Sequence, residues 1–116
     1  MNYLVQLKLA DRPTTPQEGI VFIEQFILPT LELCKKLEAE KTIVAGGPLS
    51  GAIALSLIVD AESAQELDNL ISSLPVWPQM ETTVTPLSTF DVRMQAVRAR
   101  LDQLKLEQSK LQGGAR

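Results

Sequence analysis

The chain has 116 residues, 45% of them hydrophobic, and carries 14 acidic against 11 basic side chains, a formal net charge of −3. It contains one cysteine and no histidine. One chain therefore cannot form a Ser-His-Asp or Cys-His catalytic centre, a histidine-ligated metal site or an intrachain disulfide. This length favours a single compact unit, and we expect neither an organic cofactor nor a metal ion.

The N-terminal part of the sequence predicts a strand followed by a helix. Residues 2–9 alternate between apolar and polar side chains, as a half-buried strand does. One face carries Tyr3, Val5, Leu7 and Leu9, and the other carries Leu4, Gln6 and Lys8. Thr15, followed by Pro16 and Glu18, is typical of a helix start, and the apolar spacing continues to about Lys41. We expect Pro29 to kink or interrupt this helix.

The middle of the sequence predicts a hairpin. A short β-prone run at 42–45 and an almost entirely apolar run at 52–59 flank a cluster of turn-forming residues at 46–51. Because the second run lacks alternation, we expect it to be buried on both of its faces.

A second helix and a last strand complete the predicted sheet. Asp60 or Ser63 begins the helix, Pro75 stops it, and residues 80–87 favour a strand. The order βαββαβ predicts a ferredoxin-like α+β fold, in which both helices cover one face of a four-stranded antiparallel sheet. The other face would leave apolar side chains in water. We therefore predict that two subunits stack their sheets as a dimeric α+β barrel.

The C-terminal segment predicts a separate long helix. From residue 91 to 112 it would extend about 33 Å at 1.5 Å per residue. Seven residues are spaced alternately by four and three, as in a coiled-coil seam: Phe90, Met94, Val97, Leu101, Leu104, Gln108 and Leu111. The helix either folds back over its own subunit or packs on a partner chain. We expect a barrel domain at 1–89 and a helix with its tail at 90–116.

Side-chain alternation also predicts a candidate site on the sheet. If Tyr3 faces the helices, Gln6 and Lys8 face the barrel side. Glu81 is then a candidate general base, with Lys8 as its electrostatic partner. The predicted pocket lining consists of Gln6, Ser56, Trp77 and Thr83. In the alternative interpretation, these residues are solvated strand ends, and Trp77 is a packing anchor.

The segment at 74–87, which begins LPVWPQM, resembles the corresponding segment of muconolactone Δ-isomerase and its relatives. Residues 30–61 are similar without apparent gaps. The resemblance implies a ferredoxin-like subunit, dimeric barrels and larger homo-oligomers. It also implies a proton shift in a small unsaturated lactone without a cofactor. The hairpin at 42–53 lacks the Arg, His, Trp and Tyr side chains in which that family is rich, so an apolar ligand is expected.

These observations lead to two functional hypotheses. In the first, the chain is an isomerase-like homo-oligomer that binds or isomerises a small apolar molecule in the barrel. In the second, it is a non-enzymatic interaction oligomer that uses its C-terminal helix. Residues 1–89 carry a charge of −6 and residues 90–116 carry +3, without interleaved aromatic residues in the tail, so we expect no nucleic-acid partner. We expect no membrane span and a cytoplasmic location.

Overall fold

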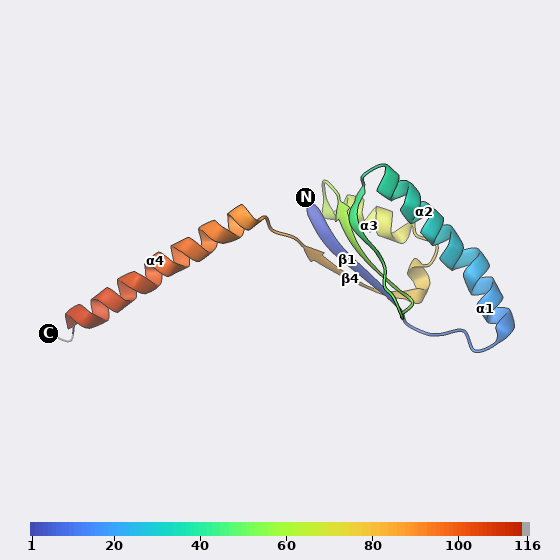
Figure 1. The fold of residues 1–116 in the computed structure, drawn as a ribbon, viewed down its shortest axis with the longest axis horizontal. Coiled ribbons are helices and arrows are strands. Elements are labelled where there is room, and N and C mark those ends of the chain that lie inside the picture. Colours follow the sequence, from blue (N-terminus) through green and yellow to red (C-terminus); the bar gives the residue numbers. More distant parts are fainter. Residues whose placement is uncertain (115–116) are drawn as a thin grey trace.

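The computed structural model describes residues 1–114 and contains one four-stranded sheet, with helices on one side of it and a projecting C-terminal helix (Figure 1). The elements in chain order are β1 (Asn2–Leu9), α1 (Pro16–Phe22), the π-helical turn η1 (Ile23–Ile27), α2 (Leu28–Ala39), β2 (Ile43–Pro48), β3 (Ala54–Asp60), α3 (Ala64–Ser72), the 3-10 turn η2 (Trp77–Gln79), β4 (Met80–Pro86) and α4 (Phe90–Gly114).

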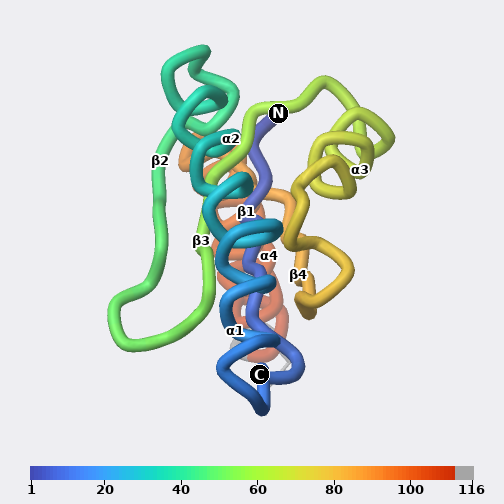
Figure 2. The backbone as a smooth tube through the Cα atoms, turned by 90° about the vertical axis from the view of Figure 1, so that its right-hand side faces the viewer, coloured from blue at the N-terminus to red at the C-terminus, as the bar shows by residue number. Residues whose placement is uncertain are grey.

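The sheet has the strand order β2-β3-β1-β4, and all of its neighbouring strands are antiparallel. Figure 2 views this sheet through α1, α2 and α3, which lie on one side of it, with α4 behind. The predicted ferredoxin-like α+β fold is confirmed. Strand β1 occupies a central position and pairs with both β3 and β4, so residues from three strands meet along its length.

The hydrophobic core lies between the sheet and the helices. On β1, Tyr3, Val5 and Leu7 are buried. The alternate residues Gln6 and Lys8 are exposed. The predicted orientation of β1 is therefore correct. The core also includes side chains of β3, of α3 and of the residues just after α3: Leu55, Leu57, Val59, Leu67, Ile71 and Leu74. Each fully buried side chain of this size contributes about 1.5–3 kcal/mol to the hydrophobic stabilisation.

The first helix begins as the sequence predicts. The Thr15 hydroxyl accepts a hydrogen bond from the Glu18 amide at 3.2 Å. The predicted disturbance at Pro29 lies one turn earlier, because the chain changes to π-helical geometry over Ile23–Ile27 and returns to α geometry at Leu28. A proline ring collides with the carbonyl four residues before it in a regular helix. That carbonyl belongs to Gln25, within the widened turn.

The hairpin differs from the prediction. The sequence places Gly46, Gly47 and Pro48 in a turn, whereas the structure includes them in β2. The pairing of β2 with β3 is irregular between Ile43 and Ala45. Gly46 has a φ of 103°, and a Cβ atom there would overlap the carbonyl oxygen of the paired strand. Glycine permits the close pairing at this position, because it adopts positive φ without a steric cost.

A buried hydrogen bond joins α2 to the segment that connects α3 with η2. The Thr30 hydroxyl on α2 accepts a hydrogen bond from the Val76 amide at 3.0 Å, and both residues are 2% exposed. Val76 lies between α3 and η2, so the bond fixes α2 to the connection that leads into β4. Ser63 caps α3 by accepting from the Glu66 amide, which settles the choice between the two predicted caps.

The C-terminal helix projects from the sheet (Figure 1). Residues 90–111 are all exposed, and the radius of gyration is 21.6 Å, against about 13 Å for a compact chain of similar length. The alternative in which this helix folds back over its own subunit is therefore wrong. The Thr89 hydroxyl accepts from the Val92 amide at the helix start, and the helix continues two residues beyond the predicted end, to Gly114.

Candidate functional site

Four of the six predicted site residues meet on the side of the sheet opposite the helices. Gln6 and Lys8 of β1 and Glu81 and Thr83 of β4 line a hollow of about 260 Å³, together with neighbouring apolar residues. We call it the open-face hollow; its other lining residues are Leu7, Leu49, Ala54 and Leu55. The strand register produces this grouping, because Lys8 pairs with Glu81 and Gln6 pairs with Thr83.

The hollow holds a cation and a carboxylate side by side. Directly opposed residues on antiparallel strands have Cβ atoms about 4.5–5.5 Å apart, so the side chains of Lys8 and Glu81 leave the sheet next to each other. They are both exposed and do not form an ion pair with each other. Among the described residues, the one ion pair joins the Met1 amino group to Asp60 at 3.2 Å. Both charges are therefore available to a ligand.

The two remaining predicted residues do not line the open-face hollow. Ser56 lies on β3, where it pairs with Gln6 of β1, and it is partly exposed. Trp77 lines a separate hollow of about 350 Å³ together with Ile71 and Val84. Val84 occupies the strand face opposite to that of Glu81, because side chains alternate along β4. The prediction that Trp77 shares a pocket with Gln6 is therefore wrong: the η2 turn places the indole beside α3.

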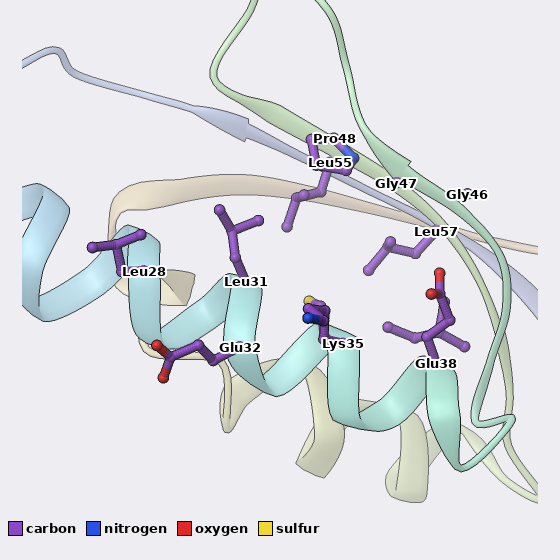
Figure 3. A pocket seen from close by; sticks show the side chains of 12 residues that line it. Leu28, Leu31, Glu32, Lys35, Glu38, Gly46, Gly47, Pro48, Leu55 and Leu57 are labelled. Carbon is purple, nitrogen blue, oxygen red and sulfur yellow. The ribbon is translucent and has the colours of Figure 1, made fainter.

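The sequence interpretation missed an apolar cleft between α2 and the sheet. This helix–sheet cleft has a volume of about 220 Å³, and a second cavity of about 180 Å³ shares Leu31, Pro48 and Leu55 with it. In Figure 3, Leu31 points from α2 toward the sheet, whereas the Glu32 carboxylate points away from it. The sequence signal was Gly47, which borders the cleft and has open space around its Cβ position.

The single cysteine also borders the helix–sheet cleft. Cys34 is partly exposed, and burial raises the pKa of its thiol. A raised pKa lowers the thiolate fraction near neutral pH, so this residue lacks the activation that a cysteine nucleophile needs. Within residues 1–114, no three potential ligands among Cys, Asp and Glu are grouped so as to hold a metal ion. No described helix is long and apolar enough to cross a bilayer.

The fold is that of an α+β protein with a ferredoxin-like sheet, and polar and charged side chains lie on the uncovered face of this sheet. The family model of muconolactone delta-isomerase matches residues 1–93, and the chain belongs to this family. The crystal structure of muconolactone isomerase at 3.3 Å resolution shares the fold, with 22% sequence identity and a TM-score of 0.63. The similarity covers 77% of this chain and 90% of that chain. No curated protein gives a sequence match.

Proposed function

We propose that the chain binds a small, weakly polar unsaturated lactone in the open-face hollow and shifts a proton between two of its carbon atoms. The observation that carries this proposal is the strand register, which pairs Lys8 with Glu81 inside one hollow. Family membership supports the reaction class, since muconolactone delta-isomerase is named for an isomerisation.

The proposed site requires a second subunit as a cover. The sheet face that carries the hollow also exposes part of Leu4 and Ile58 to solvent. Stacked sheets pack about 10 Å apart, which encloses these apolar groups and excludes water from a ligand between the sheets. Exclusion of water strengthens the interaction between Lys8 and a developing negative charge. We therefore propose a homodimer, or a larger assembly built from it, as the functional unit.

Glu81 and Lys8 have complementary roles in the proposed reaction. In a lactone whose double bond is not conjugated with the carbonyl, the Glu81 carboxylate removes a proton from the carbon next to the carbonyl; in a conjugated lactone such as muconolactone, it removes the proton from the γ-carbon instead. In both cases the electron pair of the C–H bond delocalises onto the carbonyl oxygen. The Lys8 ammonium group stabilises that oxyanion. The protonated Glu81 then returns the proton to the far carbon of the conjugated system, which moves the double bond and restores the carboxylate. The step consumes no external acid, oxidant or reductant.

The lining of the hollow favours a ligand without its own charge. Leu49 and Ala54 contribute apolar surface, while Gln6 and Thr83 offer neutral hydrogen-bonding groups. Lys8 is the one cation in this lining, and the proposed reaction uses it for the enolate oxygen. A lactone with a methyl substituent therefore suits the hollow better than one with a carboxylate.

The proposal is tested by proton exchange and double-bond migration in two lactones. We expect the full-length protein to isomerise α-angelica lactone, which carries a methyl group, faster than muconolactone, with deuterium uptake from D2O followed by NMR. Glu81→Gln should lower kcat/KM by about 10²-fold or more, because general bases contribute about 10²–10⁴. Lys8→Met should lower kcat by about 10²-fold through loss of oxyanion stabilisation.

Two exposed residues away from the hollow provide matched controls. Glu24 in η1 and Lys36 in α2 are exposed. Glu24→Gln and Lys36→Met remove the same kinds of charge as the two site variants, and they should leave turnover unchanged. Sedimentation should give a mass at least twice the 12.7 kDa of one chain. The absence of turnover with both lactones would refute the proposed reaction. Full activity in Glu81→Gln or Lys8→Met would remove that residue from the mechanism.

A further inference from the structure

Helix α4 presents an apolar seam that nothing in its own subunit covers. We define the α4 seam by seven residues: Phe90, Met94, Val97, Leu101, Leu104, Gln108 and Leu111. Val97 is 57% exposed, and Leu101 and Leu104 are 48% and 45% exposed. Isolated helices are marginally stable in water, and an apolar stripe on a helix is normally packed against another element. The seam therefore needs a partner of matching length and spacing.

The spacing of the seam matches the seam of another α4. Intervals of four and three residues are the heptad pattern of two-stranded coiled coils, in which the seams of two helices face each other. The family match ends at residue 93, so almost all of the seam lies outside the part of the chain that the family shares. We propose that α4 pairs with the α4 of a second copy of this chain as an antiparallel coiled coil. This inference rests on α4 alone and is independent of the proposed reaction.

Charges beside the seam disfavour a parallel pair in register. Arg93 and Arg100 flank one side of the seam, and Arg98 and Lys105 flank the other. In a parallel pair, each residue on the first side approaches the residue five positions later on the partner. Arg93 would meet the partner's Arg98, and Arg100 would meet the partner's Lys105. All four of these contacts are between like charges.

An antiparallel pair centred on Ala99 reverses this balance. In that register, six of the seven seam residues lie level with another seam residue of the partner: Phe90 with Gln108, Met94 with Leu104, and Val97 with Leu101. Leu111 lies beyond the paired region, because the level position on the partner precedes the start of α4.

The flanking charges of this register are complementary. Arg93 lies beside the partner's Glu107, and Asp91 lies beside the partner's Lys105. Symmetry repeats both contacts, which gives four opposite-charge pairs. Two arginine–arginine contacts remain at the centre. A shift by seven residues in either direction leaves two opposite-charge and two like-charge pairs. Charge pairing at these positions sets the orientation of coiled-coil helices, so the antiparallel register centred on Ala99 is the one that the sequence favours.

The orientation of the pair decides where the two globular parts lie, and the copy that pairs through α4 is a different one from the copy proposed to cover the sheet face. Each α4 leads away from its sheet, and the sheet and its helices lie at the Phe90 end (Figure 1). An antiparallel pair places the two globular parts at opposite ends of the coiled coil. A parallel pair would bring both of them to the same end.

Disulfide formation between single engineered cysteines tests the orientation in the full-length protein. The background is Cys34→Ala, which removes the native thiol. Arg100→Cys places two thiols almost level in the antiparallel pair. Gln108→Cys separates them by 18 residues, about 27 Å, but brings them together in a parallel pair. Ala99→Cys, on the outer face, reports random encounter.

We expect Arg100→Cys to form a disulfide dimer roughly tenfold faster than Ala99→Cys, because pairing raises the effective concentration of the thiols. Gln108→Cys should react no faster than the outer-face control. Faster reaction of Gln108→Cys than of Arg100→Cys would establish a parallel pair and overturn the inference. Equal rates in all three variants would show that α4 does not pair with itself.

A charge swap provides a second test. Glu107→Arg replaces two opposite-charge contacts by like-charge contacts and should slow disulfide formation in the Arg100→Cys protein. Adding Arg93→Glu restores the opposite charges with their positions exchanged and should restore the rate. If the charges of α4 affected solubility alone, Arg93→Glu would not restore the rate of disulfide formation. Failure of the second substitution to restore the rate would overturn the proposed register.

Discussion

The hydrogen bond between Thr30 and Val76 gives the sharpest test of how the helical layer is held. Thr30→Val keeps the shape of the side chain but removes the hydroxyl acceptor, so the Val76 amide stays buried without a partner. An orphaned buried donor costs about 1–3 kcal/mol. With an unfolding entropy of about 2.1 cal/mol/K per residue, each kcal/mol corresponds to about 4 °C for a chain of this size. We therefore expect the Tm to fall by about 4–12 °C.

Thr82→Val is the matched control for this prediction. The Thr82 hydroxyl is buried in β4 and has no hydrogen-bond partner, so the same chemical change removes an unsatisfied polar group. We expect an unchanged or higher Tm, because replacing an unpaired buried hydroxyl by a methyl group leaves nothing unsatisfied. Thermal unfolding and urea unfolding of both variants provide the measurement. Equal losses in the two variants would refute the reasoning, since the cost would then be unrelated to hydrogen bonding.

Three further predictions follow from the backbone and from the titrating groups. Gly46→Ala should destabilise the protein by about 2 kcal/mol or more, because positive φ and overlap with the paired strand act together. Gly47→Ala is the control, and urea unfolding should show a change in its free energy of unfolding within about 0.5 kcal/mol, since no atom lies near its Cβ position. Hydrogen bonds from the Thr14 amide and hydroxyl lower the pKa of Glu18, so this contribution to stability is present above the unfolded pKa and is lost as the pH falls through the folded one. Thr14→Ala should raise the Glu18 pKa part of the way to its ordinary value in an NMR titration, and an unchanged pKa would contradict the role of the hydroxyl. Because burial raises the pKa of the Cys34 thiol, the thiol should react with a thiol reagent near neutral pH more slowly in the folded than in the urea-unfolded chain. Equal rates would contradict that account.

The sequence predicts those elements whose side chains carry a periodic pattern. The period of two in residues 2–9 located β1 with its correct bounds and its correct buried face. The same alternation placed Lys8 on the face opposite the helices, and the register then brought Glu81 beside it. Alternation along a strand is sufficient for this purpose, because it fixes the face of every residue once one buried residue is assigned.

The features that sequence reasoning missed depend on contacts between distant segments. The pairing of β2 is set by its neighbour β3 rather than by its own glycine-rich sequence, so the strand was shortened in the prediction. The helix–sheet cleft lies between α2 and the strands β2 and β3, and local sequence patterns do not describe how closely such distant segments pack. Trp77 was grouped with the wrong hollow because a residue in a turn has no period from which its direction follows.

The irregular β2 strand has a consequence for how copies of the chain associate. β2 is one edge of the sheet, and an exposed edge offers unpaired amides and carbonyls on which a strand of another molecule can be added. Here the positive φ of Gly46 distorts the edge, and Pro48 has no amide to donate. Growth of the sheet by strand addition is therefore disfavoured on this side, which protects the protein from fibril-like assembly. Ordered contact through sheet faces and through α4 remains possible.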